Sequence, residues 1–106
     1  MVGIYKNITT NSDDVVTTLI PIGANSGNIK TITIANNDTD PAINIDVYIE
    51  DAGANKYYYI SNVNIPSGVS LVLNDDISFN SRVYALKILT NQAVDNTAPN
   101  ISVIVK

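Results

Sequence analysis

Hydrophobic and polar positions alternate along most of this chain, and the alternation is clearest between residues 43 and 50. Aliphatic side chains at its odd-numbered positions are separated there by Asn44, Asp46, Tyr48 and Glu50. Side chains of a strand alternate between its two faces, whereas a helix would spread these aliphatic residues around its circumference. The β-branched Ile and Val would also lose rotamer freedom in a helix. The stretch is therefore predicted to be a half-buried β-strand around which the rest of the chain is organised.

Similar patterns predict about eight strands in all, each followed by turn-forming residues. We expect them at residues 2–9, 15–20, 28–35, 43–50, 56–65, 69–73, 82–90 and 100–106, with a short crossing segment at 77–79. This succession without a helical segment favours an all-β fold of two antiparallel sheets packed face to face, either an immunoglobulin-like or a jelly-roll sandwich. A closed eight-stranded barrel is the alternative. No linker divides the chain, so residues 1–106 are expected to form one domain.

The first ten residues allow two interpretations. They are apolar enough to need cover, yet Gly3 and Lys6 interrupt the pattern. Residues 1–10 are therefore expected to be either an extended arm that adds to a neighbouring subunit's sheet or an edge strand of the chain's own sheet.

Composition narrows the range of functions. The 106 residues include no cysteine and no histidine, which removes thiolate metal sites, the usual general base and the Ser-His and Cys-His nucleophile pairs. The formal net charge is −4 and the six cationic residues are scattered, whereas phosphate backbones are held by clustered Lys and Arg. No run approaches the roughly 20 apolar residues of a membrane span. We expect a soluble protein that folds where it is made and binds neither nucleic acid nor membrane.

Acidic pairs are the only candidates for catalysis or metal binding. They are Asp38 with Asp40, Glu50 with Asp51, and Asp75 with Asp76. Ca²⁺ takes six to eight oxygen ligands, but no EF-hand spacing is present. A glycosidase needs two carboxyl groups at a fixed separation, and nothing in the sequence fixes one. Asp at the start of a loop commonly caps the turn with its side-chain oxygen. We therefore predict no metal, no cofactor, no catalytic residue and no enzymatic activity.

Three consecutive tyrosines, Tyr57, Tyr58 and Tyr59, stand out as a possible binding surface. Neighbouring side chains of a strand point to opposite faces, so at least one ring must project outward. An exposed tyrosine ring offers apolar area at a small entropic cost, which suits a protein partner or a carbohydrate. Packing between neighbouring strands would explain two of the rings without a ligand. A protein partner is the favoured reading.

The order of these signals resembles small structural proteins encoded by tailed bacteriophages, especially phages of marine bacteria and cyanobacteria. The likeness spans nearly the whole chain and is carried by Ile4-Tyr5-Lys6-Asn7-Ile8-Thr9, Ser26-Gly27-Asn28-Ile29, Ile32-Thr33-Ile34-Ala35-Asn36, Val47-Tyr48-Ile49-Glu50-Asp51, Tyr57-Tyr58-Tyr59-Ile60, Ile65-Pro66-Ser67-Gly68 with Leu71-Val72-Leu73, and Ser102-Val103-Ile104-Val105-Lys106. These motifs are structural, and no catalytic residue is carried over.

The resemblance implies a β-sandwich component of the virion, made in the host cytoplasm and present in many copies. The favoured function is a capsid decoration protein that binds the outer shell, and so the major capsid protein or other virion proteins, as a homo-oligomer. The residues expected at the contact are Ile4, Tyr5, Tyr57, Tyr58 and Tyr59. A neck or tail component and a carbohydrate-binding adhesin module are the alternatives.

Overall fold

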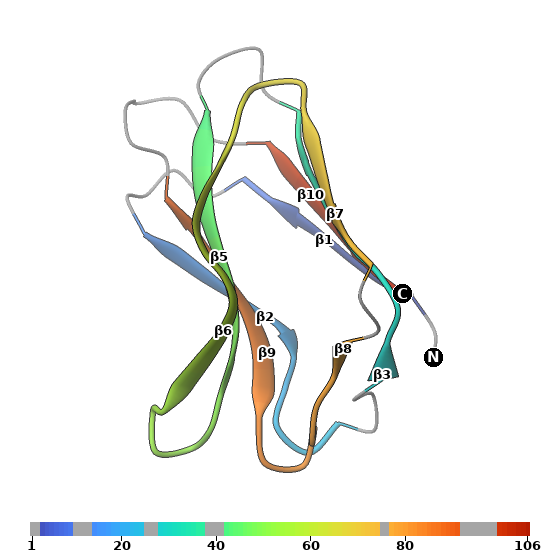
Figure 1. Ribbon diagram of the computed structural model, residues 1–106, viewed down its shortest axis with the longest axis vertical. Coiled ribbons are helices and arrows are strands. Elements are labelled where there is room, and N and C mark those ends of the chain that lie inside the picture. The colour runs from blue at the N-terminus through green and yellow to red at the C-terminus, as the bar shows by residue number, and fades with distance from the viewer. Residues whose placement is uncertain (1–2, 10–13, 25–27, 38–41, 75–76, 92–99) are drawn as a thin grey trace.

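The computed structural model describes residues 3–9, 14–24, 28–37, 42–74, 77–91 and 100–106. They form ten β-strands: β1 Ile4–Ile8, β2 Val15–Ile20, β3 Asn28–Ile29, β4 Ile32–Asn36, β5 Ile43–Glu50, β6 Lys56–Ile65, β7 Ser70–Leu73, β8 Ile77–Ser78, β9 Ala85–Asn91 and β10 Ile101–Val105. Two four-stranded sheets pack face to face, and the short β3 and β8 make a small third sheet (Figure 1). The all-β sandwich prediction is thus confirmed. Within the described ranges, no helix is long and apolar enough to cross a membrane.

The strand pairing follows one simple rule. Each strand of the first half pairs antiparallel with its mirror partner in the second half: β5 with β6, β4 with β7, β3 with β8, β2 with β9 and β1 with β10. The chain is therefore one long hairpin that is rolled up, and rolling adds the pairs β10–β4 and β9–β5.

The resulting strand orders, β1-β10-β4-β7 and β2-β9-β5-β6, distinguish between the predicted architectures. The first two strands of an immunoglobulin sandwich share a sheet, whereas β1 and β2 lie in different sheets here. Each four-stranded sheet also keeps two open edges, which excludes a closed barrel. The fold is a jelly-roll sandwich.

The strand at residues 43–50 lies inside its sheet, as an organising strand should. β5 has the predicted bounds and is flanked by β6 and β9. Its odd-numbered side chains point into the space between the sheets, where they meet the aliphatic side chains of β4, β9 and β10. The largest fully buried side chains of the described residues are Ile20, Ile29, Ile32, Ile34, Ile45, Ile65, Leu86, Ile88, Ile101, Val47, Val103 and Val105.

Two predicted strands have different bounds in the structure. The predicted strand at 28–35 is divided, because the backbone N–H groups of Lys30 and Thr31 both donate to the carbonyl oxygen of Lys106, at 2.7 and 3.0 Å. The chain turns there from the small β3–β8 sheet into the β4 sheet. The predicted strand at 82–90 begins only at Ala85. A turn precedes it, in which the carbonyl oxygen of Asn80 accepts the N–H groups of the residues three and four positions later, at 3.1 and 2.9 Å.

Two bulges interrupt the pairing of β6 with β5. The register shifts between Ile45 and Val47 and again between Val47 and Tyr48, each time with one extra residue on β6. At the first bulge Asn62 takes a left-handed conformation with φ of 54°. Its backbone N–H donates to a carboxylate oxygen of Asp46 on β5. A bulged edge strand is a poor template for further strand pairing.

Residues 4–8 form β1, which pairs with β10 along its whole length and is the edge strand of its sheet. Ile8 is buried and Ile4 packs against the core from a half-buried position. Lys6 occupies the alternate position between them, facing the interior, but stays exposed at the sheet edge. A charge at that position of an edge strand disfavours pairing with another chain.

Candidate interaction surfaces

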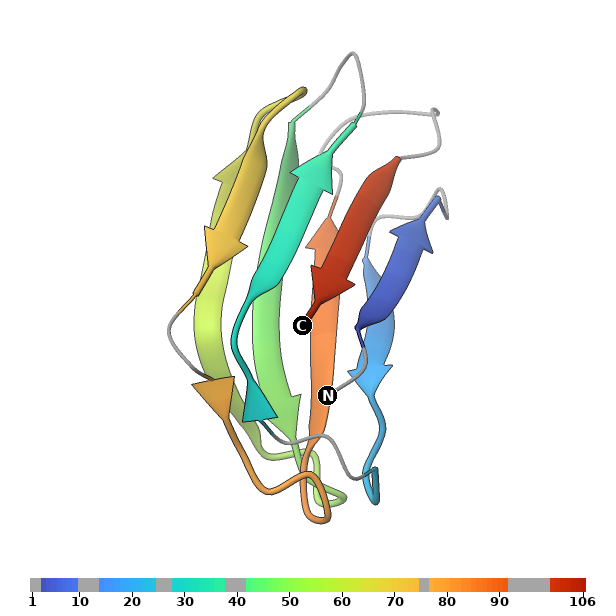
Figure 2. The ribbon, with the colours of Figure 1, turned by 90° about the vertical axis from the view of Figure 1, so that its right-hand side faces the viewer.

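The five predicted contact residues occupy two separate places. Ile4 and Tyr5 lie on β1, at one edge of the sandwich, while Tyr57, Tyr58 and Tyr59 lie on β6. In Figure 2, β1 and β2 form one side of the molecule and β6 and β7 form the opposite side. A partner that covers one group of residues therefore leaves the other uncovered.

The three tyrosines of β6 are all exposed, at 57% for Tyr57, 50% for Tyr58 and 37% for Tyr59. They do not share a face, as the period of a strand requires. Tyr57 is opposite Ile49, and its ring meets the edge of the Tyr84 ring with centroids 5.9 Å apart. Tyr58 is opposite Tyr48, and those rings lie tilted at 5.2 Å. The tyrosines thus extend around the sheet edge.

Tyr48 and Tyr84 complete this aromatic group, and the sequence analysis did not single them out. Tyr48 points to the outer face of its sheet yet is only 2% exposed, because Tyr58 and the ammonium group of Lys56, 5.3 Å from the ring centroid, cover it. Burial raises the pKa of the Tyr48 phenol, and the negative charge of Glu50 raises it further. Burial likewise raises the pKa of Tyr59. The sequence contained a signal for Tyr48. It occupies an outward position of its strand, and one hairpin turn separates that strand from the three consecutive tyrosines.

One side of the molecule is formed by a stretch without charge. From Tyr57 to Asn74 the sequence contains no charged residue, and this stretch builds β6 apart from its first residue, Lys56, then the following turn and β7. Besides the tyrosines it exposes Val69 and Val72. We call the exposed side chains Tyr57, Tyr58, Tyr59, Val69 and Val72 the β6–β7 side. Most exposed large hydrophobic residues among those described gather there.

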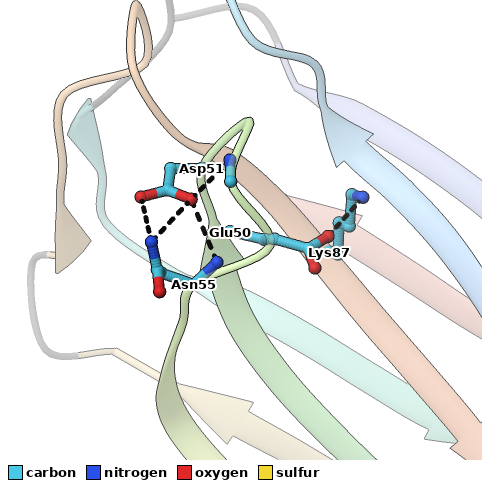
Figure 3. A network of polar contacts seen from close by, with 5 residues as sticks. Glu50, Asp51, Asn55 and Lys87 are labelled. Atoms are coloured by element: carbon cyan, nitrogen blue, oxygen red, sulfur yellow. Dashed lines mark hydrogen bonds and ion pairs between the residues drawn. The ribbon is translucent and has the colours of Figure 1, made fainter.

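Glu50 and Asp51, one of the candidate acidic pairs, make contacts at the β5–β6 hairpin. Glu50 pairs with Lys87 of β9 at 2.6 Å (Figure 3). Asp51 caps the β5–β6 turn, where one carboxylate oxygen accepts the backbone N–H groups of Gly53 and Asn55 at 2.9 and 3.0 Å. Hydrogen bonds from the backbone and the side chain of Asn55 lower the pKa of Asp51.

No group of three or more metal-ligating side chains occurs in the part of the chain that the structure describes. The other candidate acids, Asp38, Asp40, Asp75 and Asp76, lie outside that part.

Comparison with known proteins shows a likeness of fold. No protein-family model matches the chain, and no curated protein matches it in sequence. The fold is similar to a chain in the structure of infectious bursal disease virus Gx strain, with a TM-score of 0.50 and 10% sequence identity. The match covers 97% of this chain and 28% of that chain, so the present chain corresponds to less than a third of its length. The jelly-roll sandwich is thus an architecture that this chain shares, over nearly all of its residues, with a chain from a virus structure.

Proposed function

We propose that the protein is a non-enzymatic structural component of a bacteriophage virion, most specifically a capsid decoration protein that binds the outer shell. The observation that carries the proposal is the jelly roll itself, shared over 97% of the chain with a chain of a virus structure. The sequence resemblance to small phage virion proteins supports the same class. It is also the reason for proposing a phage as the virus and the outer shell as the position on the particle.

The β6–β7 side is the contact surface that we propose for the shell. It combines aromatic rings with a stretch of sequence that has no charged side chain. Aromatic anchors provide most of the binding energy in protein interfaces. The molecule measures 37 × 26 × 18 Å, so one side can supply an area near the ~800 Å² per partner of a standard interface. The bulges of β6 disfavour strand addition at that edge, and the exposed rings favour a contact made by side chains. Many copies in a symmetric array would turn modest contacts into durable attachment.

Binding to shells tests this surface directly. Purified protein is mixed with shells of the encoding phage that lack it, and bound protein is measured after sedimentation. We expect Tyr57→Ala and Tyr59→Ala each to weaken binding at least tenfold, since truncating an interface anchor commonly costs 2 kcal/mol or more (about thirtyfold). Tyr5→Ala, an exposed tyrosine on the opposite side, is the matched control and should bind normally. Unchanged binding of both β6 variants would contradict the proposed surface.

Copy number separates decoration from a neck or tail position. A protein that covers the shell should be present in hundreds of copies per particle, measured by gel densitometry against the major capsid protein. A neck or tail component should be present in about six to a few dozen copies, as ring symmetries dictate. A count in the lower range would move the protein to the neck or tail, and absence from purified particles would contradict a virion role.

A further inference from the structure

The outer face of the β1-β10-β4-β7 sheet has two features that point to a ligand. All eight outward positions of its four strands carry uncharged side chains, although the chain has sixteen charged residues. Directly opposite residues form two rows across the sheet. One row is mostly apolar and consists of Tyr5, Ile104, Thr33 and Val72. The other is mostly polar and consists of Asn7, Ser102, Ala35 and Ser70.

Tyr5 is the most exposed large hydrophobic residue described, at 65%. Its ring lies against the backbone of Gly3. A Cβ atom at Gly3 would come within 2.8 Å of the Tyr5 hydroxyl oxygen and 3.0 Å of the ring carbon that bears it. A Cβ atom at residue 3 would therefore require the Tyr5 ring to shift. The ring is thus backed by the chain while much of its surface stays open to solvent.

A shallow open depression of about 380 Å³ lies next to this ring, lined by residues 5–7 of β1 and 102–104 of β10. Two hydrogen-bonding side chains line it, Asn7 and Ser102. The Ser102 hydroxyl oxygen accepts the side-chain N–H of Asn37 at 2.7 Å, which leaves the hydroxyl hydrogen directed elsewhere. Lys6 and Val103 also border the depression, but their side chains alternate to the other face of the sheet.

We infer that this depression is a binding site for a neutral saccharide, with Tyr5 as the stacking platform and Asn7 and Ser102 as the hydrogen-bonding groups. A pyranose ring has an apolar face of C–H groups and a rim of hydroxyls, which matches an aromatic ring beside amide and hydroxyl side chains. The apolar and polar rows are two residues apart, about 7 Å, so one sugar ring can touch both. The absence of outward-pointing charge favours a neutral sugar over an acidic one.

The site does not depend on the proposed shell contact. It lies on β1 and β10, at the edge away from the β6–β7 side, so a molecule attached by β6 and β7 would present it to the surroundings.

The test is an NMR titration of the full chain, labelled with ¹⁵N. The probes are hexasaccharides of glucose in α-1,4, β-1,4 and β-1,3 linkage, of N-acetylglucosamine and of mannose, with sialyllactose and oligogalacturonate as acidic probes. We expect at least one neutral probe to shift the amide signals of residues 5–7 and 102–104 at millimolar concentration. No shift by any neutral probe up to about 10 mM, a shift only by acidic probes, or shifts confined to β6 would overturn the assignment.

Variants identify the groups that bind. Tyr5→Ala should weaken the saccharide at least tenfold, whereas Tyr5→Phe keeps the ring and should retain binding within about twofold. Gly3→Ala displaces the Tyr5 ring and should therefore weaken binding, although no residue that contacts the sugar is substituted. Tyr57→Ala, on the opposite side, should bind the sugar normally, so the saccharide site and the shell contact can fail separately. Equal sugar affinity of Tyr5→Ala and the unaltered chain would contradict the site. So would amide shifts at residues 5–7 and 102–104 that follow the protein concentration and not the sugar concentration.

Discussion

Asn36 is the most deeply buried polar residue among those described, and its hydrogen bonds explain its place. Its side chain is 1% exposed, and its amide nitrogen donates to the carbonyl oxygen of Ile65 at 3.0 Å. Its backbone exchanges hydrogen bonds with Val69 and Gly68, at 3.0 and 2.8 Å. Asn36 of one sheet therefore fastens the turn through which the chain leaves the other sheet at the end of β6.

Substitution of Asn36 should be costly. Asn36→Ala leaves a buried carbonyl oxygen without its partner and opens a small cavity, so we expect the free energy of unfolding to fall by about 2 to 3 kcal/mol. Urea denaturation followed by circular dichroism measures this. Asn37→Ala is the matched control, because it removes the 2.7 Å bond to Ser102 at an exposed position and should cost less than about 1 kcal/mol. Equal losses in the two variants would refute a fastening role for Asn36.

Asp51 should make the hairpin turn sensitive to acid. Hydrogen bonds to its carboxylate lower its pKa in the folded protein below the ordinary value, so the unfolded chain takes up the proton first as the pH falls. The stabilisation is complete above about pH 4 and is lost as the pH drops through the folded pKa. Melting temperatures between pH 5 and pH 2 should therefore decline less steeply for Asp51→Asn than for the unaltered chain. Parallel profiles would mean that the turn makes no contribution to acid sensitivity.

At the scale of the element, β6 is shaped by its bulges. Asn62 has a positive φ and donates its N–H to Asp46, and both features let an extra residue fit into the strand. Asparagine and glycine accept this conformation, whereas a β-branched residue is strained in it. We expect Asn62→Gly to be nearly neutral and Asn62→Val to lower the free energy of unfolding by about 1 to 2 kcal/mol, measured in urea. If Asn62→Val were as stable as Asn62→Gly, the bulge would not depend on this conformation.

The limits of sequence reasoning also lie at the level of elements. Alternation located β5 because it buries one face, and a one-residue slip would expose that face. It did not separate β3 from β4, since the division depends on hydrogen bonds to Lys106, at the far end of the chain. Nor did it place Tyr48 under Tyr58, because contacts across strands depend on register. The sequence predicted outward exposure within the three consecutive tyrosines of β6. It did not predict that they lie on the opposite side of the molecule from Tyr5.

Across the whole molecule, the strands pair in a nested order, and the two end strands therefore contribute very differently to the buried core. β10 lies between β1 and β4, and three of its side chains, Ile101, Val103 and Val105, are fully buried. β1 lies at the edge of the same sheet, and Ile8 is its one buried residue. Both strands belong to the rolled hairpin, but only β10 contributes several buried side chains to the core.

Truncation tests this asymmetry. Burying an aliphatic side chain stabilises a fold by about 1.5 to 3 kcal/mol, so loss of the three buried residues of β10 removes most of a typical stability of about 5 to 15 kcal/mol. A chain that ends at residue 100 should therefore show the circular dichroism of an unfolded protein. A chain that begins at residue 10 loses about 3 kcal/mol and should still unfold cooperatively, at a lower urea concentration. Cooperative melting of the first variant, or collapse of both, would show that the order of strands does not set the weight of each end.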